Sequence, residues 1–101
     1  MKISVSSGND SANFILEGEI DEVGAQTIKT KYHELNNNSL KNLTFDFKNV
    51  THIGSAGIGK LLLFYKDVAT KGGDIFILNP SKMINDLFVQ LRLNTIFKIQ
   101  N

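Results

Sequence analysis

The order of strand and helix patterns along the 101-residue sequence predicts an α/β fold. Short apolar runs mark strands, and apolar residues repeated at three- and four-residue spacing mark helices between them. Strand–helix–strand connections favour parallel neighbours, whereas two strands joined by a short turn form an antiparallel hairpin. The sequence therefore predicts a mixed sheet of four to five strands with helices packed on it, in the order β-β-α-β-α-β-α and then a possible edge strand.

The first part of the chain is predicted to form a hairpin and a helix. Residues 3–5 and 14–18 have strand patterns, and the turn-rich segment 6–11 separates them. Asp21 is a preferred type of N-cap, so we expect a helix that runs from there through Leu35. Its expected buried stripe has helical spacing and comprises Ala25, Ile28, Tyr32 and Leu35.

The middle of the chain repeats the strand–helix alternation. Apolar and polar residues alternate over 43–47, which predicts a strand, and an amphipathic helix is expected over 58–69. Gly72 and Gly73 suit a left-handed helix end. The continuous apolar run 75–78 is typical of a strand covered on both faces.

The last part is predicted to form a third helix and an edge strand. Pro80 is suited to a helix start, and residues 96–99 have the composition of a strand. The core-facing residues expected on the helix are Met83, Ile84, Leu87 and Leu91.

Composition places limits on function. Hydrophobic residues make up 42% and charged residues 21% of the sequence, as expected of one globular domain over residues 1–101. The net charge of +1 gives no argument for nucleic acid or an anionic membrane. The chain has no cysteine, which excludes disulfides, thiolate metal ligands and cysteine nucleophiles. The longest apolar stretch, 61–65, is too short to span a bilayer, so we expect a cytoplasmic protein that does not bind membranes.

A glycine-rich turn at residues 54–59 is the most informative segment. Residues 54–60 match the spacing G-x-x-x-x-G-K of a phosphate-binding P-loop, but Leu61 stands where the Mg²⁺-binding hydroxyl belongs. The glycines follow G-x-x-G-x-G, which departs from the dinucleotide pattern G-x-G-x-x-G. Ser55 lies where the next helix is expected to start, so its hydroxyl is either a plain N-cap or a phosphoacceptor beside free N–H groups.

Other polar residues give no catalytic pattern. His52 and His33 lack partners at metal-ligand spacing, and no carboxylate pair suggests acid–base catalysis. We therefore expect no metal, no cofactor and no catalytic residue.

Three stretches of the chain carry a family resemblance. Residues 46–59, Asp-Phe-Lys-Asn-Val-Thr-His-Ile-Gly-Ser-Ala-Gly-Ile-Gly, resemble the signature of STAS domains, and of bacterial anti-sigma factor antagonists in particular. Residues 16–21 resemble the family's apolar-x-Gly-Glu-Leu-Asp, and residues 71–78 resemble its Gly-Gly-x-apolar strand. The closing segment 93–99 also agrees, so the resemblance covers nearly the whole chain in order. It implies the STAS fold, with helices packed mainly on one face of the mixed sheet.

The resemblance also implies a mechanism. In such antagonists the serine that corresponds to Ser55 is phosphorylated by a partner, an anti-sigma factor with a GHKL-type serine kinase fold. The unphosphorylated form binds this partner, and a PPM-type serine phosphatase restores that form. The implied protein is a switchable binding module and not an enzyme, and we expect a monomer or weak dimer. The partner-binding residues implied are Asp21, Gly54, Ser55, Ala56, Gly57, Ile58 and Gly59.

The chain departs from the family at one position of this segment, because the family usually has Asp where this sequence has Gly54. Two other functions remain open from the sequence. One is a small nucleotide-binding protein that uses the 54–60 loop. The other is a STAS subunit of a larger signalling assembly, stressosome-like or involved in lipid transport.

Overall fold

The sheet has five strands in the spatial order β1-β2-β3-β4-β5, in a computed structural model that describes residues 1–35 and 39–101. β1 and β2 are antiparallel, and each later neighbour is parallel to the strand before it. The predicted hairpin, parallel crossovers and mixed sheet are therefore confirmed. The strands are β1 (Lys2–Ser7), β2 (Ser11–Ile20), β3 (Asn42–Ile53), β4 (Asp74–Leu78) and β5 (Lys98–Gln100).

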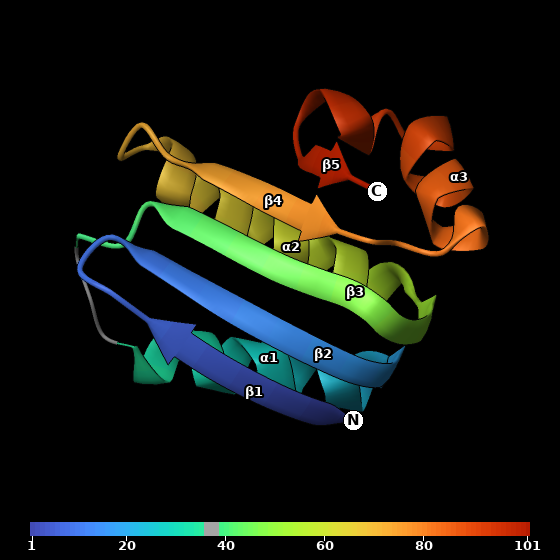
Figure 1. Ribbon diagram of the computed structural model, residues 1–101, viewed down its shortest axis with the longest axis horizontal. Helices are drawn as coiled ribbons and strands as arrows, with labels where there is room; N and C mark the ends of the chain where they lie inside the picture. Colours follow the sequence, from blue (N-terminus) through green and yellow to red (C-terminus); the bar gives the residue numbers. More distant parts are fainter. Residues whose placement is uncertain (36–38) are drawn as a thin grey trace.

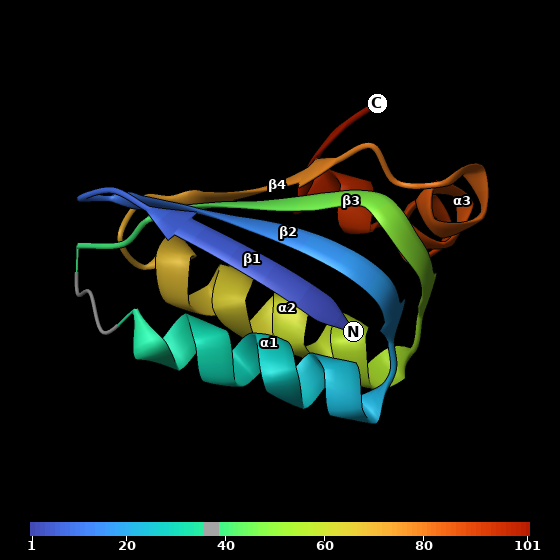
Figure 2. The same cartoon turned by 60° about the horizontal axis from the view of Figure 1, so that its bottom comes forward.

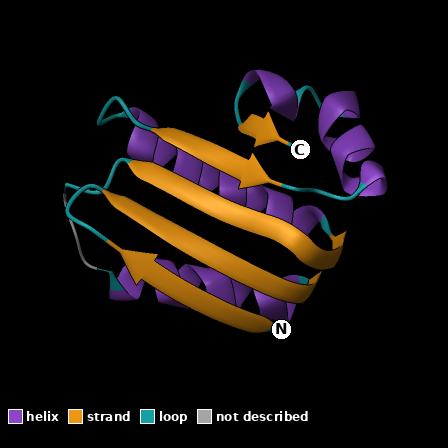
Figure 3. Cartoon of the chain, viewed as in Figure 1, coloured by secondary structure: helices purple, strands orange, loops and turns teal. Residues whose placement is uncertain are grey.

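Two of the three α-helices cover one face of this sheet. α1 (Glu22–Glu34) and α2 (Ser55–Ala69) lie side by side beneath it, as Figure 2 shows. α3 (Lys82–Gln90) lies beyond the end of β4, next to the end of β3, and leads through the short 3₁₀ helix η1 (Leu93–Thr95) into β5 (Figure 1). Among the described residues no helix crosses the opposite face, which is turned toward the viewer in Figure 3. Helices packed mainly on one face are thus confirmed.

The core lies between the sheet and the pair α1 and α2. Alternate residues of β2 and β3 point into it, and the ring of Phe45 stacks between those of Phe14 and Phe64, with centroids 4.9 and 6.1 Å away. Burying each such side chain contributes roughly 1.5–3 kcal/mol to folding. The fully buried residues that the strands contribute include Phe14, Leu16, Ile20, Leu43, Phe45, Phe47, Ile75 and Ile77.

β4 is covered on one face only, so the prediction of a strand covered on both faces is wrong. Ile75 and Ile77 are buried against the helices, whereas Phe76 and Leu78 point to the open face and are half-buried. Lys98 from β5 lies over the Phe76 ring, with its Nζ 5.8 Å from the centroid. The long side chain of Lys98 therefore shields part of an apolar surface that no helix covers.

α3 turns only part of the predicted face to the core. Ile84 and Phe88 are buried and Leu87 is half-buried, but Met83 and Leu91 are 58% and 50% exposed. The orientation follows from Phe88, whose ring meets Phe47 and Phe97 edge to face at 5.9 and 6.1 Å. A helix that buries Phe88 at this aromatic contact must turn Met83 outward.

β3 extends beyond the predicted strand 43–47 and curls at its end. The pairing of β2 with β3 shifts register on both sides of Gly18, which has a φ of +111° that favours glycine. The two strands then bend together toward the start of α2 (Figure 2). This bend carries Ile53 and the residues after it below the plane of the sheet, where the glycine-rich segment begins.

Candidate functional site

Helix α2 begins at Ser55, three residues earlier than predicted. Gly54 is the N-cap residue, with an extended backbone, and its carbonyl oxygen accepts the N–H of Ile58 at 3.1 Å. Ser55 is the first helical residue, so the reading of Ser55 as the N-cap is wrong. Its side chain is exposed and has no hydrogen-bond partner among the described residues. The Ser55 hydroxyl therefore does not cap α2.

The other two caps show the contrast. Asp21 Oδ1 accepts the N–H of Gly24 at 2.7 Å and caps α1, as predicted. Ser81 Oγ accepts the N–H of Ile84 at 3.2 Å and caps α3. The N-cap residue of α2, Gly54, has no side chain. Within the described residues no side chain therefore caps the first N–H groups of α2, which lie beside Ser55 at the positive end of the helix dipole.

Gly57 has an internal role. A Cβ at this position would lie 2.6 Å from Ile20 Cγ2 and 2.9 Å from Ile53 Cγ1, which is closer than real Cβ atoms come. Gly57 is buried, and its missing side chain lets α2 approach the ends of β2 and β3. Gly57, one of the partner-binding residues that the resemblance implies, is therefore a buried packing position in this structure.

The remaining predicted residues divide by exposure. Gly54 and Gly59 are exposed, and a Cβ at Gly59 would meet no atom within 4 Å. Ala56 and Ile58 are half-buried and pack against the core. Asp21 is exposed. It lies close to Gly54, because the preceding residue, Ile20, pairs with Ile53 and its carbonyl oxygen accepts the N–H of Gly54 at 3.0 Å. The residues open to a partner around Ser55 are thus Asp21, Gly54 and Gly59, with parts of Ala56 and Ile58.

The glycine-rich segment does not form a nucleotide-binding loop. A P-loop needs non-helical backbone whose N–H groups converge on phosphates. Here residues 55–60 already form the first turns of α2, and Lys60 lies within the helix. The geometry therefore gives no support to the nucleotide-binding alternative.

Residues 1–35 and 39–101 contain no group of three or more acidic, histidine or cysteine side chains placed to hold a metal ion. The same residues include no helix with the length and apolar character needed to cross a membrane.

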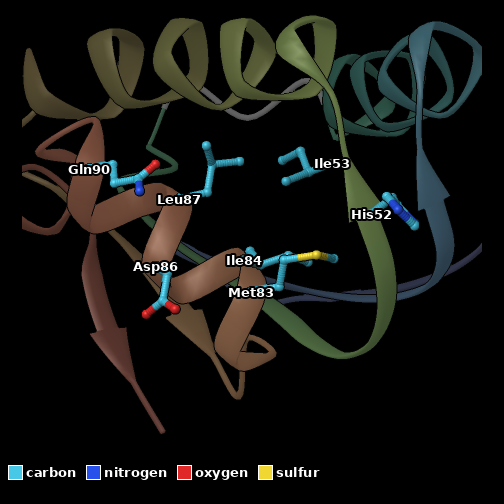
Figure 4. A pocket seen from close by; sticks show the side chains of 7 residues that line it. All are labelled: His52, Ile53, Met83, Ile84, Asp86, Leu87 and Gln90. Carbon is cyan, nitrogen blue, oxygen red and sulfur yellow. The ribbon is translucent and has the colours of Figure 1, made fainter.

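A groove that no sequence pattern predicts lies next to the site. It has a volume of about 380 Å³ and runs between the end of β3, at His52 and Ile53, and α3 (Figure 4). Phe88 of α3 packs against Phe47 of β3 beside the groove, and no local pattern indicates this long-range contact. Ile53, which lines the groove, is two residues from Ser55, so the groove lies near the candidate site.

Solved structures share this architecture. A putative anti-sigma factor antagonist from Thermotoga maritima is 18% identical, with a TM-score of 0.86 over 98% of this chain and 86% of that one. An anti-sigma factor antagonist from Mycobacterium paratuberculosis is 19% identical, with a TM-score of 0.82 over 98% and 84%. The Bacillus cell fate determinant SpoIIAA in its phosphorylated form is 18% identical, with a TM-score of 0.78 over 99% and 92%.

At these identities the likeness shows a common fold. The sequence itself decides the family, because residues 6–101 match the pattern of the STAS domain. With that match, the mixed sheet and the exposed serine at the start of α2, the chain belongs to the STAS domain family.

Proposed function

We propose that this protein is a partner-switching regulator of the anti-sigma factor antagonist kind, controlled by phosphorylation of Ser55. Its unphosphorylated form binds a GHKL-type serine kinase that acts as an anti-sigma factor, and a PPM-type phosphatase reverses the modification. One observation carries the proposal: the Ser55 hydroxyl is exposed at the start of α2 and is not used as a cap. The protein acts by binding in the cytoplasm and has no catalytic activity of its own.

The position of Ser55 suits a phosphate in the free protein. The N–H groups in the first turn of a helix attract anions, and a phosphate would add about −1.5 to −2 charges at pH 7. Because no side chain occupies this helix end, the phosphate displaces no internal contact. We therefore expect the fold to persist after phosphorylation.

In a complex the same phosphate would be unfavourable. A charge that becomes buried in an interface must lose its hydration, and truncating or adding a charge there changes binding by about 2–5 kcal/mol. Gly54 and Gly59 have no side chains that protrude around Ser55, so a partner would approach the backbone closely. A binding surface of this kind is switched by charge alone, without a large conformational change.

The test uses three proteins, wild type, Ser55→Ala and Ser55→Asp, each used to capture partners from cells of the source organism. Captured proteins are identified by mass spectrometry, and Ser55 is examined for phosphate. We expect a GHKL-type kinase to be retained by wild type and Ser55→Ala and lost by Ser55→Asp. Equal retention by all three, with no phosphate on Ser55, would show that this chain has the fold but not the switch.

A further inference from the structure

The groove beside Ser55 is built from one face of α3 and the end of β3. Met83 and Leu87 are four residues apart and so lie on the same side of the helix. In Figure 4 the side chains of Ile53 and Leu87 point toward one another across the gap, and Met83 extends along it toward β3. The buried side chains of Ile53 and Ile84 form the floor. The lining at the centre is thus apolar, and the remaining lining residues, His52, Asp86 and Gln90, are polar.

The volume of the groove and the exposure of Met83 indicate a binding surface. Its roughly 380 Å³ falls within the range of about 300–1,000 Å³ that is usual for ligand sites. Met83 is 58% exposed and lines the groove. Methionine is flexible and polarisable, and it is common on surfaces that adapt to a partner's side chain. The groove is therefore suited to one bulky apolar side chain.

The surface on the other side of Ser55 is acidic. The segment 17–22 contains four carboxylates, whereas the adjoining end of β3, residues 48–53, contains one lysine, Lys48. Glu17, Glu19 and Glu22 are exposed and form no ion pair within the described part of the chain. Glu19 pairs in register with His52, which borders the groove. The acidic strand end and the apolar groove thus adjoin.

From this arrangement we infer that the surface from Glu19 to Met83 binds a protein segment in which basic residues stand beside a bulky apolar side chain. The basic residues pair with Glu19 and Glu22, and the apolar side chain enters the groove over Ile53. The inference rests on the proposed function, since Ser55 lies beside both regions and the same partner would engage all three. It adds the chemistry of the partner, which a switch at Ser55 alone does not specify.

The test measures peptide binding to the whole ¹⁵N-labelled protein by NMR. The probe is a synthetic peptide in which a short run of lysines is joined by a Gly/Ser spacer to a Phe–Leu pair. Two control peptides replace the lysines with glutamates or the Phe–Leu pair with alanines. We expect amide shifts at Glu19, His52 and Met83 with the first peptide only, weakening as salt is added because exposed charges are screened.

Two variants of the same helix give a matched comparison. Met83→Asp places a charge in the groove, whereas Val89→Asp places one at a similarly exposed position, 49%, that does not line it. We expect affinity for the peptide to fall about tenfold in Met83→Asp, which corresponds to about 1.4 kcal/mol, and to stay unchanged in Val89→Asp. Thermal unfolding of both variants checks that the fold is kept.

The inference is overturned by equal affinity in the two variants, by shifts elsewhere, or by no shift at millimolar peptide. Ser55→Ala separates this outcome from the proposed function. It should remove phosphorylation but leave peptide affinity unchanged. The groove can therefore fail the test while the switch at Ser55 stands, and the switch can fail while the groove still binds the peptide.

Discussion

The phenol of Tyr32 on α1 donates a hydrogen bond to the carboxylate of Asp67 on α2, and this bond joins the two helices that cover the sheet. The Tyr32 ring also stacks on Phe64 with centroids 4.4 Å apart. Asp67 lies 3.7 Å from Lys71 Nζ as well. Tyr32 thus links α1 to α2 by one apolar and one polar contact.

Replacing Tyr32 with phenylalanine should remove only the polar contact. The ring stack on Phe64 remains, so we expect a loss of about 1 kcal/mol in the free energy of unfolding, the usual net value of one hydrogen bond. Urea denaturation of wild type and Tyr32→Phe measures it. A variant as stable as wild type would mean that water replaces the bond without cost.

The contact between Tyr32 and Asp67 also predicts that the free energy of unfolding depends on pH. Burial and the Asp67 carboxylate raise the pKa of the Tyr32 phenol above its ordinary value of 10.0. The folded protein therefore holds this proton more tightly than the unfolded chain, and the stabilisation is complete below about pH 10 and lost as the pH rises above it. The stability difference between wild type and Tyr32→Phe should shrink in the alkaline range. A constant difference up to pH 11 would contradict the role given to Asp67.

Gly57 and Gly59 should respond to alanine in opposite directions. Both lie in α2, where alanine favours the helix over glycine by about 0.8–1 kcal/mol. At Gly59 nothing opposes this gain, so Gly59→Ala should stabilise the protein. At Gly57 the new methyl group would overlap with Ile20 and Ile53. Overpacking costs about 1–3 kcal/mol, so we expect net destabilisation. Equal effects in thermal unfolding would show that Gly57 is not a packing requirement.

Ser81 and Ser55 offer a second matched pair, one serine that caps a helix and one that does not. Ser81→Ala removes the bond to the Ile84 N–H and should cost about 1 kcal/mol. Ser55→Ala removes no internal hydrogen bond and should change stability by less than about 0.5 kcal/mol. Chemical denaturation of the two variants is the measurement. A large loss in Ser55→Ala would return Ser55 to a structural role.

Restoring the family's aspartate at position 54 should strengthen the cap of α2. Aspartate caps better than glycine by a few tenths of a kcal/mol, and a Cβ at Gly54 would meet nothing closer than the Ile20 carbonyl oxygen at 3.8 Å. The new carboxylate would accept the N–H groups that a phosphate on Ser55 would otherwise meet. We therefore expect Gly54→Asp to raise the melting temperature slightly and to lower the stability of the phosphorylated form relative to the unphosphorylated one. Melting curves of both forms of each protein test this, and an unchanged difference would contradict it.

The parts of the fold that sequence patterns predicted are those fixed by local chemistry. The alternation of Phe45 and Phe47 with polar residues identified β3, and Asp21 was identified as a cap from its residue type. The face of α3 was not predictable in this way, because Met83 and Phe88 are equally apolar and only the distant rings of Phe47 and Phe97 select between them.

The candidate site was predicted in position but not in detail. The resemblance located Ser55, yet residue preference left open a cap position that Gly54 holds instead. The resemblance placed Gly57 among the partner-binding residues, but the side chains of Ile20 and Ile53 cover it, and residue type alone gives no sign that a glycine is buried. The groove at α3 arises from contacts between segments far apart in the chain, so no pattern in the sequence could indicate it.

The uncommitted hydroxyl at the start of α2 has a consequence for how such domains diverge. Because the helix does not depend on Ser55, a duplicated copy of the chain can lose, keep or replace this residue and still fold. The same holds for the exposed carboxylates of the neighbouring strand end. The residues that recognise a partner can therefore change without changing the fold, so domains with this architecture can differ in the partners that they bind.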